Sequence, residues 1–188
     1  LAEGAVLAEF RIAPLLFESH GVAGEAAVEA LLAGLAKSPL PLGEKSGLIV
    51  CAMRHLPESE TMRAARLALR YQGQGVIGFD LAGAERGHPA SGHARALALC
   101  RDAGLPLTLH AGEADSAERV VEAVRLGARR IGHGVRLVDA LGDPLRRAAL
   151  DLLAKLNRKA LAEKPHEVEL AARIESFELA YRMQLAAP

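Results

Sequence analysis

The sequence is poor in cysteine and in aromatic residues. Cys51 and Cys100 are the only cysteines among 188 residues, and aromatic residues make up 3% of the chain. Each cysteine lies in an apolar pattern, so we expect two buried, reduced thiols rather than a disulfide, as in the cytoplasm. Stabilisation by a disulfide framework is therefore not expected, and a hydrophobic core has to hold the fold.

The sequence also lacks net charge and long apolar runs. Its 23 basic side chains balance 23 acidic ones, and no basic run stands out, which argues against nucleic acid or an acidic membrane as a partner. No stretch of about 18 apolar residues and no charged-then-apolar leader is visible, so the sequence predicts neither a membrane span nor a signal peptide. With 51% hydrophobic residues, it is typical of an ordinary globular protein.

Short apolar runs alternate with longer amphipathic stretches up to about residue 135. This alternation is typical of βα units that form a parallel sheet with helices outside it. Because the runs are nearly uniformly apolar, we expect both faces of the sheet to be covered. The predicted strands are residues 5–12, 47–53, 76–81, 105–110 and 130–133.

Four helices are predicted between these strands, at residues 24–37, 57–71, 92–103 and 115–127. Pro57 suits the first turn of its helix, and Asp115-Ser-Ala-Glu118 has the spacing of a capping box. After residues 143–144 the alternation ends, and two helical patterns follow at 145–161 and 166–185. We therefore predict two domains, a partial α/β unit at 1–140 and a helical tail of different origin at 141–188.

The glycines from Gly73 to Gly78 match the pattern G-x-G-x-x-G of dinucleotide-binding loops. A loop that binds phosphate must follow a strand and open a helix, so that its amides point at the anion. Here the glycines precede a predicted strand and run into it. A helix end followed by the entry to a strand explains them, and no dinucleotide site is expected.

Polar residues gather where three successive predicted strands end. His110 and Glu113 follow one strand, His133 ends the next, and Asp80 and Gly83 end the strand before. The carboxyl ends of parallel strands form the edge at which α/β barrels and open sheets place their sites. Taken singly, each histidine is more often a packed, hydrogen-bonded residue, and Asp80 can simply cap a turn. The convergence of the group is what favours a site.

The residue types in this group suit metal-assisted hydrolysis. A neutral imidazole is a good zinc ligand, a carboxylate can carry protons to a heterocycle, and a second imidazole can deprotonate metal-bound water. The remaining histidines lie in turns or polar segments, and we expect them to be solvated. They are His20, His55, His88, His93 and His166.

Five segments occur in the order of one known family, and over residues 3–138 the chain resembles adenosine deaminase. The segments are residues 8–14 (AEFRIAP), 48–54 (LIVCAMR), 75–83 (GVIGFDLAG), 110–113 (HAGE) and 130–134 (RIGHG). The resemblance implies a TIM (β/α)8 barrel, of which this chain holds strands two to six. It also implies a zinc-dependent reaction that converts adenosine and water to inosine and ammonia.

The resemblance assigns roles to the residues of the rim. It implies that His110 binds the catalytic zinc, Glu113 protonates the purine ring nitrogen, and His133 handles the proton of the zinc-bound water. It further implies that the backbone of Gly83 contacts the purine, which glycine permits because it lets main chain approach a ligand closely. Asp80 is placed with Gly83 among the substrate-binding residues.

The chain departs from the family pattern in its metal ligands. The family takes two more zinc ligands from a His-x-His and another from paired aspartates, and this chain contains neither motif. A catalytic zinc normally needs three protein ligands, so we predict that the chain alone is inactive.

Residues 147–188 resemble a different family, namely a segment of an uncharacterised bacterial family related to sulfatases and alkaline phosphatases.

Three hypotheses therefore stand. The first is an incomplete adenosine deaminase-like zinc enzyme that acts on adenosine or a related purine nucleoside. The second is a non-catalytic α/β fragment or fusion product that is stabilised by self-association through exposed strand edges. The third is another amidohydrolase or phosphatase activity that uses the same rim.

Overall fold

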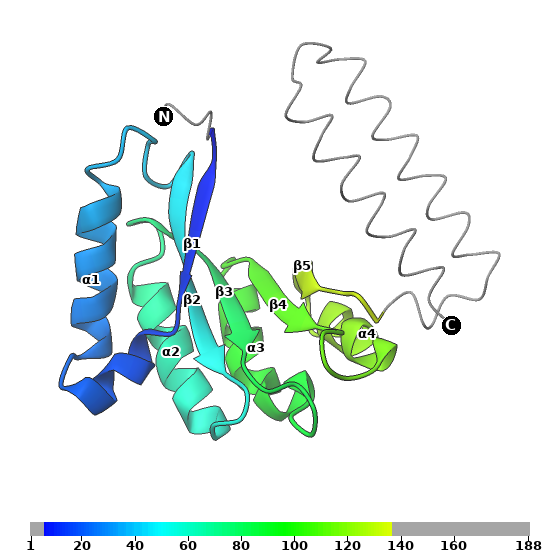
Figure 1. Cartoon of the computed structure of the whole chain (residues 1–188). Helices are drawn as coiled ribbons and strands as arrows, with labels where there is room; N and C mark the ends of the chain where they lie inside the picture. The colour runs from blue at the N-terminus through cyan, green and yellow to red at the C-terminus, as the bar shows by residue number, and fades with distance from the viewer. Residues whose placement is uncertain (1–5, 137–188) are drawn as a thin grey trace, which may run out of the picture. The chain divides into compact units, whose positions relative to one another are not determined.

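The computed structural model describes residues 6–136, in which five strands alternate with helices (Figure 1). All neighbouring strands pair in parallel, and their order in the sheet equals their order in the chain. The strands are β1 (Ala8–Ile12), β2 (Ser46–Met53), β3 (Val76–Ala82), β4 (Leu107–Ala111) and β5 (Ala128–His133). The predicted α/β class and the five predicted strands are confirmed, with ends shifted by a few residues.

The four predicted helices of this region are also present. They are α1 (Gly24–Leu35), α2 (Glu58–Arg70), α3 (Ala94–Asp102) and α4 (Ala117–Arg125), and the 3-10 helices η1 (Pro14–His20) and η2 (Ala90–His93) add to them. The capping box at the start of α4 does not form, because Ser116 is the N-cap and makes no side-chain cap bond. The carboxylate of Asp115 instead accepts the N–H of Ser116 at 2.8 Å.

The glycines before β3 behave as expected of a helix end. Gly73 and Gly75 have left-handed φ angles of 79° and 113°, and β3 begins directly after them. They join the end of α2 to β3 and open no helix, so the match to a dinucleotide-binding pattern is accidental. This geometry agrees with the interpretation of these glycines from the sequence.

The core lies between one face of the sheet and the helices. The strand residues Leu48, Phe79 and Leu109 are completely buried and belong to the same apolar cluster as Ala64 of α2 and Leu97 of α3. Burial of this apolar surface is the main force that holds the layers together. The helices in turn fix the strand ends, where the polar residues lie.

The expectation that both faces of every strand are covered is wrong for β1 and β5. Both are edge strands in which no residue is buried, and Phe10 of β1 is 48% exposed. Within residues 6–136 no further strand pairs with either edge, which is the physical reason for their exposure. The face of the sheet opposite the helices, which we call the inner face, carries polar residues such as Arg11 and Asp80.

Two predictions concern the rest of the chain. The contacts divide the chain into units 1–140 and 141–188, and the tail helices predicted at 145–161 and 166–185 lie outside the described residues. The separate origin of the tail stays a prediction. In the described part of the chain, no helix is both long and apolar enough to span a membrane.

Candidate active site

The structure brings the predicted rim residues together at the carboxyl ends of β3, β4 and β5. The rings of His110 and His133 lie 5.1 Å apart between centroids. Nε2 of His133 lies 3.4 Å from Oε2 of Glu113, and Nδ1 of His110 lies 2.8 Å from Oδ2 of Asp80. Two imidazoles and two carboxylates thus form one connected group, as the positions at strand ends indicated.

Asp80 is the buried member of this group, and its carboxylate contacts residues of β1, β2 and β4. Its carboxylate lies 3.0 Å from Nε of Arg11, and Cys51 donates its thiol to it at 3.5 Å. The backbone N–H of His110 donates to Oδ1 at 3.2 Å. Nδ1 of His110 approaches the carboxylate closely but makes no aligned hydrogen bond with it. Asp80 therefore orients His110, and its contact with a substrate stays a prediction.

The two cysteines are buried free thiols, as predicted. Burial, followed by the negative charge of Asp80, raises the pKa of the Cys51 thiol far above its ordinary value. Burial raises the pKa of Cys100 to about 12. Because the thiolate is the reactive form, neither residue can serve as a nucleophile near neutral pH.

His133 sits on strained backbone at the end of β5. Its φ of 66° makes it the only non-glycine residue with positive φ in the described range. Such strain persists only where the surrounding structure imposes it, and it is concentrated at functional sites. The preceding Gly132 packs closely against His110, since a Cβ there would lie 3.4 Å from Cγ of the imidazole. The strained backbone of His133 thus lies where the two imidazoles meet.

Gly83 turns away from β3 with a φ of 92°. A Cβ at this position would come within 3.0 Å of Nδ1 of His55 and of Cε of Met53, so only glycine fits without displacing them. The backbone here is half-buried and carries no side chain, which is compatible with close approach of a ligand. The predicted contact between Gly83 and a purine remains a prediction.

One histidine contradicts its prediction. His93 was expected to be solvated, but it is buried at the end of η2. Its Nε2 donates to the carbonyl of Arg54 at 2.9 Å, and its Nδ1 shares a hydrogen bond of 2.8 Å with the hydroxyl of Thr61. Both ring nitrogens are used, so His93 ties η2 to α2 and to the end of β2. His20 and His55 are exposed, His88 is half-buried, and His166 lies outside the described residues.

Sequence reasoning missed Glu85, which lies under the turn after β4. It is 4% exposed, and its carboxylate accepts the N–H groups of Gly112, Glu113, Ala114 and Asp115 at 2.6, 2.9, 2.7 and 2.9 Å. Burial acts to raise the pKa of Glu85, but these backbone donors hold it below its ordinary value. Its only signal in the sequence is its place two residues after Gly83, and nothing local indicates burial.

Arg54 is a second buried charge that the sequence did not single out. Nη2 donates to the carbonyl of Leu81 at 3.0 Å and to that of His110. Burial lowers the pKa of Arg54, while the negative charges of Glu85 and Asp80 act in the opposite direction. These two carboxylates provide the compensation that a buried guanidinium requires.

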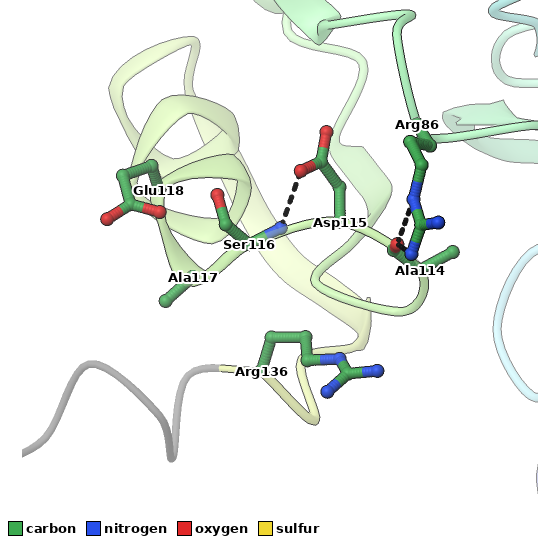
Figure 2. Close-up of a pocket in the computed structure, with 7 residues that line it drawn as sticks. All are labelled: Arg86, Ala114, Asp115, Ser116, Ala117, Glu118 and Arg136. Carbon is green, nitrogen blue, oxygen red and sulfur yellow. Dashed lines mark hydrogen bonds between the residues drawn. The ribbon is translucent and has the colours of Figure 1, made fainter.

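An open hollow of about 390 Å³ lies beside this turn, lined by Arg86, Arg136 and residues 114–118 (Figure 2). Its lining includes neither His110 nor His133, so it lies next to the imidazole pair and not on it. In Figure 2 Arg86 reaches the carbonyl of Ala114, to which Nε and Nη2 donate at 3.2 and 3.1 Å. The hollow therefore lies on the solvent-facing side of the turn that carries Glu113.

The described residues do not fit a complete zinc site. Within residues 6–136 no group of three or more His, Cys, Asp or Glu side chains could hold a metal ion. His110 is 20% exposed and can offer Nε2, but a catalytic zinc takes three protein ligands. Within residues 6–136, therefore, no further ligands accompany His110 in its predicted role as a zinc ligand.

Comparisons with known proteins show which family the chain resembles. The family model described as adenosine deaminase matches residues 1–167 and so continues past the predicted boundary near 140. An adenosine deaminase of Mycobacterium ulcerans is 39% identical over 175 residues, which are 90% of this chain and 46% of that protein. One of Enterococcus faecalis is 39% identical over 137 residues, covering 73% and 41%. The chain thus spans less than half the length of these relatives.

Solved structures agree on the fold. The adenine deaminase of Arthrobacter aurescens superposes with a TM-score of 0.68 at 29% identity, over 81% of this chain and 46% of that chain. An Arabidopsis N6-mAMP deaminase superposes with a TM-score of 0.60 at 26% identity, over 71% and 43%. The five-stranded parallel sheet is thus part of a TIM-barrel deaminase fold, as predicted.

Proposed function

The chain belongs to the adenosine deaminase family, and from this premise we propose that it carries the proton-transfer residues of a purine aminohydrolase. Such an enzyme replaces an amino group on the purine ring with oxygen from water and releases ammonia. The observation that carries the proposal is the convergence of His110, His133 and Glu113 at the ends of β4 and β5.

Each residue of the group has a geometry that suits its proposed role. Glu113 is 52% exposed, so its carboxyl can reach a bound heterocycle and protonate a ring nitrogen. His133 is 39% exposed and lies beside Glu113 and His110, which supports its proposed role of taking the proton of the attacking water. Asp80 is fully buried and serves this chemistry by holding His110 in place.

Zinc is the cofactor that we propose for the complete site, with His110 as one ligand. The metal would supply Lewis acidity toward water. The described residues do not complete its shell, and the whole sequence contains no His-x-His and no Asp-Asp pair. We therefore propose that the chain has no deaminase activity until further ligands are supplied to it.

Adenosine is the proposed substrate, because the curated relatives reported above are named adenosine deaminases. A purine nucleotide is the alternative, since an Arabidopsis structure complexed with IMP shares the fold at 26% identity and a TM-score of 0.60.

A cytoplasmic location is proposed as well, and the two buried free thiols support it.

The test compares this chain with a longer chain to which a His-x-His strand and an Asp-Asp strand have been restored. We expect the chain alone to bind zinc weakly in competition with a chelator, with no change in His110→Ala. We expect the longer chain to deaminate adenosine, with kcat falling ~100-fold or more in Glu113→Gln. Glu118→Gln, an exposed glutamate in the same region, is the matched control. No deamination of any purine nucleoside or nucleotide by the longer chain would refute the proposal.

A non-catalytic fragment stabilised by self-association is the second candidate, and the exposed edge of β1 favours it. Leu7 and Phe10 are 62% and 48% exposed on or beside this edge, and within residues 6–136 no strand other than β2 pairs with β1. Sedimentation of the purified chain tests this function. A concentration-dependent dimer or larger species is expected, whereas a monodisperse monomer that unfolds cooperatively would contradict it.

A further inference from the structure

The turn after β4 is held by one buried carboxylate. Four successive backbone N–H groups, those of residues 112–115, all point at Glu85. Oε1 accepts the first of them, from Gly112, and Oε2 accepts the other three. Convergent amides of this kind form an anion-binding nest, which is here occupied by a side chain of the protein itself.

The arrangement is specific because a buried charge is costly without its full set of partners. Moving a carboxylate out of water is unfavourable unless hydrogen bonds replace its hydration. Hydrogen bonds to an ionised acceptor are about twice as strong as neutral ones. If the turn changed its conformation, Glu85 would lose several of these bonds at once. The turn and the carboxylate therefore hold each other in one geometry.

Two arginines bind carbonyl groups in this turn and at the end of β4. Arg86 donates to the carbonyl of Ala114 from the solvent side, where Figure 2 shows its guanidinium beside the turn. Arg54 donates to the carbonyl of His110 from the buried side. Glu85 is the only one of the three that binds the backbone of Glu113 itself. It is thus the residue best placed to control the direction of the Glu113 side chain.

We propose that Glu85 is the positioning residue of this site, which fixes the backbone of residues 112–115 so that the carboxylate of Glu113 faces His133. The positive φ of 68° at Gly112 bends the chain into the nest, and the contact of 3.4 Å between Glu113 and His133 is the result. The link from this geometry to catalysis rests on the proposed function. The claim that Glu85 fixes the backbone of residues 112–115 does not depend on it.

Glu85→Gln is the decisive variant because it keeps the shape and removes the charge. If the amide oxygen takes the place of Oε2, the NH2 group faces the N–H of Gly112. If it takes the place of Oε1, the NH2 group faces three N–H donors. In either orientation donors oppose donors, so the nest cannot be satisfied. Glu58→Gln is the matched control, because Glu58 also accepts a backbone N–H, from Arg95, but it is half-buried at the start of α2 and pairs there with the Arg95 side chain.

Native-state amide hydrogen exchange of the full chain tests the hold on the turn without metal or substrate. In Glu85→Gln, the amides of residues 112–115 should exchange ~10-fold faster or more, while those of Leu48 and Val50 in β2 keep their rates. Glu58→Gln should leave the turn unchanged. Unchanged exchange at residues 112–115 in Glu85→Gln would overturn the proposal. Equal acceleration at the turn and in β2 would also overturn it, because that is the sign of general destabilisation.

The longer chain with restored metal ligands tests the link to catalysis. There Glu85→Gln should lower kcat ~10-fold to 100-fold and leave KM within about twofold, because a displaced acid affects the reacting geometry more than binding. Glu85→Asp, which keeps the charge, should recover part of kcat. A change in KM alone would refute the role in positioning. If the longer chain does not deaminate at all, the proposed function fails, and the exchange measurement still decides whether Glu85 holds the turn.

Discussion

Arg130 of β5 donates to the carboxylate of Glu9 of β1 at 2.7 Å, although 121 positions separate the two residues in the chain. They belong to the two edge strands of the sheet, so their contact requires the sheet to curl around its inner face. The same curl brings Arg11 of β1 within 3.0 Å of Asp80 of β3. The polar inner face of the described unit is therefore concave, as in a barrel.

The Glu9–Arg130 pair should contribute little to stability despite its short distance. The side chains are 27% and 51% exposed, so water screens their attraction. A double-mutant cycle with Glu9→Gln and Arg130→Gln, followed by urea unfolding, should give a coupling free energy below ~1 kcal/mol. A coupling of several kcal/mol would mean that this contact holds the sheet closed.

Phe79→Ala should cost ~3–5 kcal/mol of unfolding free energy, because Phe79 is completely buried between the sheet and the helices. Phe10→Ala is the matched control, since Phe10 is 48% exposed on β1. We expect it to cost less than ~1 kcal/mol. Urea unfolding measures both variants. Equal losses would show that another layer covers β1 in solution.

Asp80→Asn should destabilise the chain by ~2–4 kcal/mol, because it leaves the charge of Arg11 without its buried partner and changes the contact with His110. Asp102→Asn is the matched control. Asp102 pairs with Arg101 at the surface, where it is 66% exposed, and its loss should be nearly neutral. The difference in urea midpoint between the two variants measures the effect. Similar midpoints would contradict the structural role of Asp80.

Acid should weaken the wild-type chain more steeply than Glu85→Gln. The backbone donors hold the pKa of Glu85 below its ordinary value of about 4.3. Its contribution is therefore present above about pH 4.3 and is lost as the pH falls through the lower folded pKa. Urea unfolding between pH 6 and pH 3, about the window set by this shift, measures it. Parallel pH profiles for the two proteins would exclude a stabilising role of the ionised carboxylate.

The thiols of Cys51 and Cys100 should not react with a disulfide reagent in the native chain. Both are buried, and burial raises the pKa of each. Because only the thiolate attacks, modification should be slow near neutral pH and should become rapid in guanidinium chloride, where both thiols are exposed. Rapid modification of a single thiol under native conditions would show that its region opens locally.

The positions of the strands were predictable because each central strand is buried and reads as a continuous apolar run. β2 and β3 show this most clearly, since almost all of their residues are buried. The convergence of Asp80, His110 and His133 was predictable for a related reason. Parallel strands of one sheet place their carboxyl ends at the same edge, so three strand-end residues have to meet there.

The buried charges were not predictable from local pattern. Arg54 and Glu85 lie in a turn and a loop, and His93 ends the short helix η2; side chains in such connecting segments are usually solvated. Their burial depends on partners far along the chain, such as the turn at residues 112–115 for Glu85. Local sequence does not encode which loop will cover another.

The sequence by itself therefore determined the parallel α/β architecture, the edge at which the site lies and the family to which the chain belongs. Apolar periodicity and the residues at strand ends are local properties, so they can be recognised in the sequence without knowing the distant contacts. Only the tertiary structure decided how Glu113 is aimed, because that direction depends on the carboxylate of Glu85 reaching four amides of another loop. Hydrogen bonds of this kind act over about 3 Å, and only folding brings their partners so close.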